Sequence, residues 1–268
     1  MTTAAAPPPG PPPPPPASES LLEEAVELTR RAGALTLDHF GASDLVVDAK
    51  GDGTPVTEAD RGAERLVRDY LAERYPDDAV VGEEEGATTG TSGRRWVVDP
   101  IDGTKAFTRG VPLYSNLLAL EDEHGWAVAV VNLPALGETV AAGRGLGCHH
   151  DGRRCHVSST ARLADAYLTT SGFEHWDAEV LAALHRSGAG MRTWGDGYGY
   201  ALVATGRVDA MVDPAAALWD AAPMPLLLAE AGGRFTDFDG VERADGGTGV
   251  ATNGRLHDEV LALVRTGG

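Results

Sequence analysis

Residues 96–104 have the sequence Trp-Val-Val-Asp-Pro-Ile-Asp-Gly-Thr, in which a short apolar strand pattern is followed by two aspartates. A side chain at the end of a strand is held rigidly at the edge of a sheet, within reach of solvent and ligand. Pro100 fixes its own φ angle and has no N–H, so we expect a sharp turn that directs Asp99 and Asp102 toward one point. Carboxylates this close repel each other, which favours a bound cation or raised pKa values.

Two further acidic turns strengthen this interpretation. They are Gly82-Glu83-Glu84-Glu85-Gly86 and Trp219-Asp220. Oxygen ligands without neighbouring His or Cys favour Mg²⁺ or Mn²⁺ over zinc, and the backbone carbonyl of Ile101 can add an oxygen. Gly103 and Thr104 come next, where a short helix would direct free N–H groups at a phosphate. A plain turn is the alternative, and the other acidic turns argue against it.

The hydrophobic pattern predicts alternating helices and strands. Helices are expected at 20–41, 57–75, 177–186, 198–205, 222–231 and 255–265, and strands at 79–81, 96–98, 115–120, 126–132, 138–142, 167–170 and 208–212. The first five strands indicate a mostly antiparallel sheet, whereas strands and helices alternate after about residue 160. We therefore predict an N-terminal α+β half, residues 18–160, that carries the metal site, and a C-terminal α/β half, residues 161–268, that completes it.

Residues 7–16 are all proline except Gly10. Such a segment forms polyproline II or remains disordered, so we predict a disordered tail at residues 1–17 and ordered structure from Ser20. No apolar run approaches the roughly 20 residues of a membrane span, and no secretory signal pattern is present. The two cysteines are too few to indicate a disulfide framework. These features predict a cytoplasmic protein with no membrane partner.

The formal net charge of −18 disfavours nucleic acid as a partner, because binding phosphates requires clustered Lys and Arg. An acidic protein that acts on a phosphate ester must concentrate positive charge locally. Bound divalent cations are the simplest way to do so.

These motifs resemble the inositol monophosphatase family, whose signatures are Gly-Glu-Glu, Trp-x-x-Asp-Pro-Ile-Asp-Gly-Thr, and Trp-Asp-x-Ala followed by a helix and Gly-Gly. All three occur here in order, and the resemblance covers roughly residues 20 to 265. It implies an α/β (α+β) fold, a layered α-β-α-β-α sandwich of the sugar-phosphatase type. It also implies a metal-dependent phosphoric monoester hydrolase that acts on a small phosphorylated metabolite with two or three Mg²⁺ ions, and Mn²⁺ as a possible substitute.

The resemblance assigns a role to each matching residue. It implies metal ligation by Glu83, Asp99, the Ile101 carbonyl, Asp102 and Asp220. The implied mechanism is metal-assisted hydrolysis, with Glu83 and Thr104 orienting the attacking water and Asp102 also counted as catalytic. Supporting residues around the site are expected to be Glu84, Lys50 and Asp60.

Several details are similar to the histidinol-phosphate phosphatase branch. They are Asp-Gly-Thr-Lys-Ala-Phe at 102–107, Arg-Gly-Val-Pro at 109–112, Trp-Gly-Asp-Gly-Tyr-Gly-Tyr at 194–200 and Met-Val-Asp-Pro at 211–214. Histidinol phosphate carries an ammonium and an imidazole, which carboxylates and aromatic faces would bind. Asp196 and Asp213 are the predicted substrate-binding acids, beside Gly103 and Thr104, and Tyr114 and Tyr198 are candidates for stacking on a ring.

Two departures from the branch pattern bear on packing. Gly197 stands where that branch usually has Cys, which predicts looser packing there. Pro225 falls inside the helix expected after Asp220, where it would remove a backbone hydrogen bond or displace the start of the helix.

Other functions stay open at this point. Within the family, the substrate can instead be inositol 1-phosphate, a 3′-phosphonucleotide or fructose 1,6-bisphosphate. From a different class, a non-catalytic scaffold would dock through the polyproline tail. Relatives are commonly dimeric, so the resemblance also predicts a homodimer.

Zinc is the alternative suggested by the sequence around residues 148–156. Its possible ligands there are Cys148, His149, His150, Cys155 and His156. Asp151-Gly152 between them predicts a hairpin, in which alternation scatters these side chains over both faces. Gly143, Gly145 and Gly147 likewise predict turns and not a nucleotide loop, because no strand-to-helix pattern follows.

Overall fold

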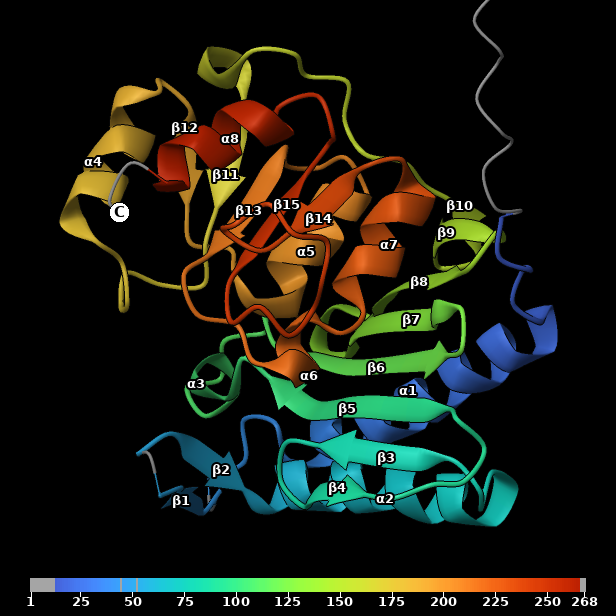
Figure 1. Cartoon of the computed structure of the whole chain (residues 1–268). Helices are drawn as coiled ribbons and strands as arrows, with labels where there is room; N and C mark the ends of the chain where they lie inside the picture. Colours follow the sequence, from blue (N-terminus) through green and yellow to red (C-terminus); the bar gives the residue numbers. More distant parts are fainter. Residues whose placement is uncertain (1–12, 44, 52, 266–268) are drawn as a thin grey trace, which may run out of the picture.

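Helices and sheets alternate in five layers through the molecule, as Figure 1 shows. The structure, a computed structural model, describes residues 13–43, 45–51 and 53–265. Its helices are α1 (Glu19–His39), α2 (Glu58–Arg74), α3 (Thr104–Phe107), α4 (Ala178–Arg186), α5 (Asp196–Ala204), α6 (Leu218–Ala221), α7 (Met224–Ala231) and α8 (His257–Val264), with short 3-10 turns at Pro134–Leu136 and Leu163–Asp165.

The larger sheet has eight strands in the order β10-β9-β8-β7-β6-β5-β3-β4. These strands are β3 (Ala79–Gly82), β4 (Gly86–Thr88), β5 (Arg95–Asp102), β6 (Ser115–Asp122), β7 (Gly125–Leu133), β8 (Glu138–Gly143), β9 (Gly147–His150) and β10 (Arg153–Arg154). All neighbours pair antiparallel except β3 and β5, which confirms the mostly antiparallel sheet predicted for this half.

The smaller sheet has five strands in the order β12-β11-β13-β15-β14. They are β11 (Tyr167–Thr169), β12 (Gly190–Arg192), β13 (Ala210–Asp213), β14 (Arg234–Thr236) and β15 (Gly249–Thr252), and a separate hairpin joins β1 (Val47–Ala49) to β2 (Pro55–Thr57). Strands β14, β15 and β12 were not predicted, because each has only three or four residues and shows little alternation.

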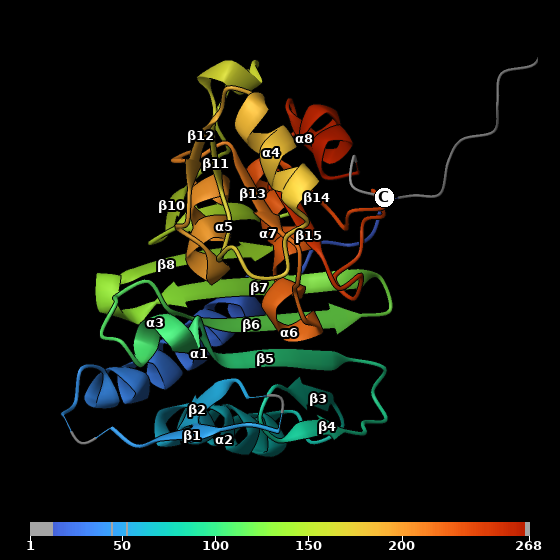
Figure 2. The same cartoon turned by 90° about the vertical axis from the view of Figure 1, so that its left-hand side faces the viewer.

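The layers follow from which helix faces are apolar. Helices α1 and α2 cover one face of the large sheet, and α5 and α7 fill the space between the two sheets. Helices α4 and α8 cover the outer face of the small sheet, and Figure 2 shows the same order from the side. Helix α5 is buried nearly all round, as expected for a helix between two sheets. The predicted α-β-α-β-α sandwich is confirmed.

The two predicted halves share one core. Strand pairing changes from the large to the small sheet between residues 154 and 167, close to the predicted boundary at residue 160. The main buried cluster nevertheless joins Leu117 and Val131 of the large sheet to Met211 and Phe235 of the small one. Whether the halves are separate units stays a prediction.

The structure describes the end of the predicted tail and the start of one predicted helix. Residues 1–12 of the predicted tail lie outside the described residues, but its end is docked, because Ala17 N–H donates to the Arg144 carbonyl at 2.8 Å. The helix expected at 222–231 begins two residues later, because Ala222 is the C-cap of α6 and Pro223 the N-cap of α7. Pro225 falls in the first turn of α7, where a missing N–H costs nothing.

Candidate active site

Three aspartates from two distant parts of the chain converge at one end of β5. Asp99 and Asp102 come from β5 and Asp220 from α6, and one carboxylate oxygen of each lies within 4.8 Å of the other two. Among the described residues, this is the only group of three or more His, Cys, Asp or Glu side chains so placed. The structure therefore brings together three of the four carboxylates predicted as metal ligands.

A bulge in β5 aims the first two aspartates. Asp99 pairs with Leu117 and Asp102 with Ser115, so Pro100 and Ile101 together stand opposite Asn116 alone. The sharp turn predicted at Pro100 is therefore wrong: the chain stays in the strand, and the extra residue re-aims the side chains. The Pro100 carbonyl accepts a hydrogen bond from Asn116 Nδ2 at 2.6 Å, which fixes the bulge.

Asp99 has the features of a ligand without its cation. Its side chain is buried, and Oδ1 has no hydrogen-bond partner. Burial, then the carboxylates of Glu83, Asp102 and Asp220, raises the pKa of Asp99 well above its usual value. A buried carboxylate oxygen without a partner is costly, and a hard cation would satisfy it. The donor set, all oxygen, fits Mg²⁺ or Mn²⁺.

Asp102 and Asp220 are each fixed by hydrogen bonds to one of their own carboxylate oxygens. Asp102 Oδ2 accepts from Ser115 Oγ at 2.7 Å and from the Gly197 N–H, and burial raises its pKa well above the usual range. Asp220 Oδ2 accepts from Ala217 N–H at 2.8 Å, at the start of α6. Burial, then the Asp102 charge, raises the pKa of Asp220 to about 7.

Glu83 lies beside this group and forms an ion pair with Lys50. It follows β3, lines the same pocket and is close enough to Asp99 to raise the pKa of that carboxyl. Lys50 Nζ contacts Glu83 Oε1 at 2.6 Å and Glu84 Oε1 at 2.5 Å, and these hydrogen bonds raise the lysine's pKa against the opposing effect of burial. Burial raises the pKa of Glu84, and the Lys50 hydrogen bond opposes it.

Thr104 links the strand end to α2. Its Oγ1 lies 2.9 Å from the Ile101 carbonyl oxygen and 3.4 Å from Asp60 Oδ1. Asp60 is fully buried and closes a capping box, because its Oδ2 accepts from both the N–H and the hydroxyl of Thr57. Burial raises its pKa. Lys50, Asp60 and Glu84 thus surround the site without lining the pocket, as expected of supporting residues.

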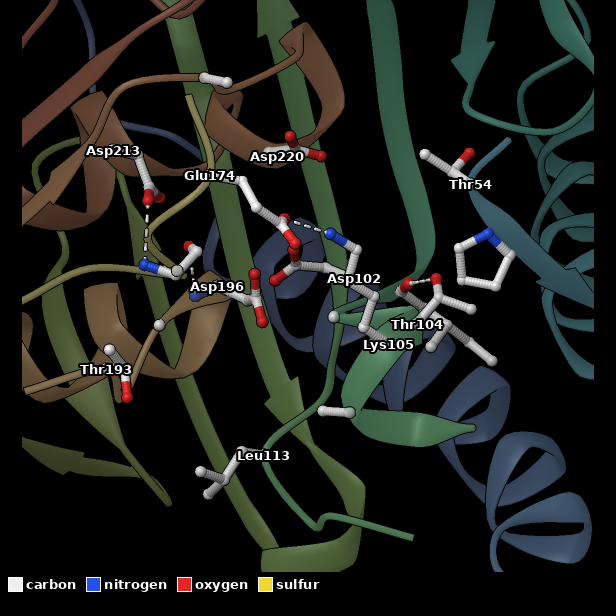
Figure 3. A pocket seen from close by; sticks show the side chains of 18 of the residues that line it. Thr54, Asp102, Thr104, Lys105, Leu113, Glu174, Thr193, Asp196, Asp213 and Asp220 are labelled. Carbon is white, nitrogen blue, oxygen red and sulfur yellow. Dashed lines mark hydrogen bonds and ion pairs between the residues drawn. The ribbon is translucent and has the colours of Figure 1, made fainter. Parts of the chain in front are cut away.

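A cavity of about 500 Å³ opens above the carboxylates, a size typical of small-ligand sites. Figure 3 shows Asp102, Thr104, Asp196, Asp213 and Asp220 around it. Gly103, with a φ of 82°, forms part of its floor, and a Cβ there would lie 3.0 Å from Asp196 Oδ2. The pocket thus joins the predicted metal ligands to all four predicted substrate-binding residues.

Asp196 and Asp213 form the wall contributed by the C-terminal half. Burial, then Asp213, raises the pKa of Asp196 to about 7, and burial raises that of Asp213 to about 6. Ser171 connects the two acids, since its N–H donates to Asp213 Oδ1 at 3.1 Å and its Oγ accepts from the Asp196 N–H at 2.9 Å. Ser171 was not predicted, because it lies in a loop after β11 with no motif around it.

Lys105 and Glu174 also line the pocket and were not predicted. Their side chains form an ion pair at 2.5 Å and reach toward each other in Figure 3. Lys105 directly follows Thr104 in the stretch 102–107, so its position next to the predicted site residues could have identified it as a pocket residue. Glu174 stands in the loop before α4, where the sequence has no helical or strand pattern.

Three predictions about the surroundings are wrong. Tyr114 is fully buried against Phe40 and Phe107, and its hydroxyl lies 3.3 Å from Thr36 Oγ1, so it cannot stack on a substrate ring. Tyr198 packs against the main core cluster and does not line the pocket. Gly197 is not loosely packed, because a Cβ there would lie 2.3 Å from Ser115 Oγ.

The predicted hairpin at Asp151-Gly152 is confirmed. Both residues have positive φ, 48° and 75°, and β9 pairs with β10 around them. Cys148 and Cys155 meet across the strands with their sulfurs 3.5 Å apart, but no third zinc-type ligand joins them within the described part of the chain. Of the three glycines predicted in turns, Gly145 lies in the turn between β8 and β9, whereas Gly143 ends β8 and Gly147 begins β9. None of the described helices is long and apolar enough to cross a membrane.

Comparison with known proteins agrees with this geometry. The model of the inositol monophosphatase family matches residues 17–267. A histidinol-phosphatase of Mycobacterium tuberculosis is 45% identical over 252 residues, which cover 91% of this chain and 97% of that protein. A fructose-1,6-bisphosphatase/inositol-1-monophosphatase of Thermotoga maritima is 34% identical, with 91% of this chain and 95% of that one covered.

The solved structures include the extragenic suppressor protein SuhB of Bartonella henselae. It superposes with a TM-score of 0.87 at 29% identity and covers 93% of this chain and all of that one. The predicted resemblance to a phosphatase family, and to its histidinol-phosphate branch in particular, is confirmed by these matches.

Proposed function

The chain belongs to the inositol monophosphatase family, and on that premise we propose that it is a Mg²⁺-dependent phosphomonoesterase that hydrolyses histidinol phosphate to histidinol and phosphate. One observation carries the proposal: the carboxylates of Asp99, Asp102 and Asp220 converge beneath a cavity of about 500 Å³, and a buried Asp99 oxygen lacks any partner. The similarity to a histidinol-phosphatase across nearly the whole chain supports the substrate.

The ligands that we propose are Glu83, Asp99, the Ile101 carbonyl, Asp102 and Asp220, for two or three Mg²⁺ ions, with Mn²⁺ as a substitute. Four of the five offer carboxylates, which Mg²⁺ prefers. When bound, Mg²⁺ would lower the pKa of a coordinated water and stabilise charge on the leaving oxygen. The cation would also offset the two causes that raise the pKa of Asp99 and Asp220, which are burial and then the repulsion between neighbouring carboxylates.

The protein's own groups have separate tasks in this proposal. Thr104 Oγ1 can donate to Asp60 or to the Ile101 carbonyl and accept from a water, so Thr104 and Glu83 would orient the attacking water. Gly103, without a side chain, allows the phosphate close to the backbone. Lys50, held by Glu83 and Glu84, would keep positive charge at the site.

The pocket wall contributed by the C-terminal half supports an amine-bearing substrate. Asp196, Asp213 and Glu174 all line the pocket, whereas Lys105 and His175 are the only basic side chains that line it within the described part of the chain. Such a wall would attract the ammonium and imidazole of histidinol phosphate, whereas inositol offers only hydroxyl groups.

A substrate panel tests the proposal. Phosphate release by the whole chain would be measured for histidinol phosphate, inositol 1-phosphate, fructose 1,6-bisphosphate and a 3′-phosphonucleotide, each with Mg²⁺ and with EDTA. We expect kcat/KM for histidinol phosphate to exceed the others by about tenfold or more, and EDTA to remove activity. A preference for inositol 1-phosphate would overturn the substrate, and full activity in EDTA would overturn the metal site.

The scaffold alternative is tested by deleting residues 1–16, which include the whole proline-rich segment. If the shortened chain retains Mg²⁺-dependent phosphatase activity, docking through the proline-rich segment is not needed for function. A cytoplasmic location and a homodimer are also part of the proposal. The free thiols of Cys148 and Cys155 are consistent with the former, and the homodimer rests on the family resemblance alone.

A further inference from the structure

Helix α2 carries three charged side chains at four-residue spacing on its inner face. They are Asp60, Glu64 and Arg68. Residues four apart in a helix lie above one another, so the three form one row. Asp60 and Glu64 are fully buried, and the Arg68 side chain is 11% exposed. Asp60 contacts the candidate site through Thr104, but the role of Glu64 is not explained by any motif.

Glu64 binds the backbone of the acidic turn that carries Glu83. Its Oε2 accepts from the Glu84 N–H at 2.7 Å, and its Oε1 accepts from the Glu85 N–H at 3.0 Å. Both N–H groups belong to the turn between β3 and β4. The Glu64 carboxylate therefore occupies the position of an anion bound by two successive backbone amides.

Two neighbours fix the carboxylate in this position. Arg68 Nε donates to Glu64 Oε1 at 2.8 Å, and Arg68 Nη2 donates to the Gly86 carbonyl at the end of the same turn. Gly82 packs against both of these side chains, because a Cβ there would lie 2.1 Å from Glu64 Oε1 and 2.8 Å from Arg68 Nη2. Gly82 has no positive φ, so glycine is required there for space and not for backbone conformation.

The turn held in this way presents Glu83 and Glu84 to the site. Glu83 lines the pocket beside Asp99, and both glutamates bind Lys50. The Glu84 N–H belongs to the peptide bond that joins Glu83 to Glu84, so fixing that amide fixes the direction in which the Glu83 side chain leaves the backbone.

We propose that Glu64 is a positioning residue for the metal site, acting through the backbone of the Glu83–Glu85 turn. The inference rests on the proposed function, since it assumes that Glu83 ligates Mg²⁺. Burying a carboxylate is costly, and an apolar residue of similar size would pack there more cheaply. Only an acceptor with two oxygens can bind both amides, and this accounts for a buried glutamate at that position.

The test compares Glu64→Gln with two other variants of the full chain. The amide of Gln keeps the shape but places an NH₂ group against one of the N–H donors. Gly82→Ala is the second variant, because it removes no charged group but displaces the Glu64 carboxylate and the Arg68 guanidinium by contact. Glu73→Gln is the matched control, since Glu73 is an exposed glutamate of the same helix.

Two values would be measured: the dissociation constant of Mg²⁺, by calorimetry, and the Mg²⁺ concentration that gives half-maximal phosphate release. We expect Glu64→Gln and Gly82→Ala to raise both values by about tenfold, as is common when a residue that supports a metal ligand is changed. KM for the phosphate ester at saturating Mg²⁺ should change less than about threefold, and Glu73→Gln should match the wild type.

A residue that only stabilises the fold would lower the melting temperature without this selective loss of Mg²⁺ affinity. Unchanged Mg²⁺ affinity in a folded Glu64→Gln or Gly82→Ala variant would overturn the inference. Should both variants fail to fold, Arg68→Gln gives the decision: a raised Mg²⁺ requirement supports the inference, and an unchanged one overturns it. If the wild type itself binds no Mg²⁺, the proposed function fails, and the inference fails with it.

Discussion

At the scale of single residues, Asp102 shows how the site is organised. One of its oxygens, Oδ2, accepts hydrogen bonds from Ser115 and from the Gly197 N–H, so the carboxylate is fixed within the cluster that it forms with Asp99 and Asp220. Asp220 follows the same pattern, with Oδ2 bound to the Ala217 N–H. Hydrogen bonds to one oxygen orient a ligand before any cation binds, which lowers the entropic cost of binding.

Asp102→Asn should nearly abolish turnover while leaving the fold intact. The substitution replaces the negative carboxylate by a neutral amide, whose NH₂ group would face either the other carboxylates or the Ser115 and Gly197 donors. We therefore expect kcat to fall by about a hundredfold or more in saturating Mg²⁺. Steady-state phosphate release measures the loss of turnover, and circular dichroism checks that the fold is intact. Asp245→Asn, at an exposed position, is the control. Activity above roughly a tenth of wild type would be inconsistent with the proposed role.

At the scale of elements, strand β5 and helix α2 position most of the site. Strand β5 delivers Asp99 and Asp102 through its bulge, and the N-terminus of α2 is fixed by the capping box of Thr57 and Asp60. The same Asp60 approaches Thr104 Oγ1 at 3.4 Å. A change at the start of α2 should therefore affect both stability and the site.

Thr57→Ala removes the side-chain half of this capping box. Loss of a cap typically costs about 1 kcal/mol of unfolding free energy, which urea denaturation would measure. Because Asp60 also loses a hydroxyl donor, we expect kcat to fall severalfold as well. Asp177→Ala, at the N-cap of α4, is the matched control and should cost similar stability without affecting kcat. Equal effects of the two variants on kcat would contradict the link between α2 and the site.

The sequence predicted the elements whose patterns are long and periodic, and it failed where tertiary contacts decide. The motif at residues 96–104 was sufficient to place Asp99 and Asp102 at a strand end, but the bulge depends on pairing with β6, which no local pattern encodes. Tyr114 was misjudged because an aromatic residue before a strand is equally compatible with core and pocket. Glu64 was overlooked because a glutamate on a helix normally faces solvent.

At the scale of the whole molecule, the two sheets and their helices gather buried acids into one place. Asp99, Asp102, Asp196, Asp213 and Asp220 all have raised pKa values, and burial is the largest cause for each. They come from β5, the start of α5, the end of β13 and α6. Without a cation, ionising these groups in the folded state costs free energy that the unfolded chain does not incur.

The metal-free protein should therefore lose stability as the pH rises from about 6.5 to about 8. The carboxyls of Asp196 and Asp220, with pKa about 7, hold protons in the folded state that the unfolded chain has already lost, and this stabilisation disappears above pH 7. Buried His257 has its pKa lowered to about 4, mainly by burial, so it opposes this trend only until the unfolded chain's histidine has lost its proton, at about pH 7.5, and by less than the two aspartates together.

Melting temperatures in EDTA and in Mg²⁺ at these two pH values check this. We expect the melting temperature in EDTA to be several degrees lower at pH 8, and the protection by Mg²⁺ to be larger there, because protons no longer compete for the carboxylates. Asp196→Asn should flatten the pH dependence. A melting temperature in EDTA that rises over this interval would show that the acids are not buried together as described.

The central claim is that distant acidic residues share divalent cations, and anomalous diffraction from a crystal soaked in Mn²⁺ tests it most directly. The account predicts strong peaks between Asp99, Asp102 and Asp220, with at least one in contact with Glu83. Absence of any peak there, or Mn²⁺ bound at Cys148 and Cys155 instead, would contradict it.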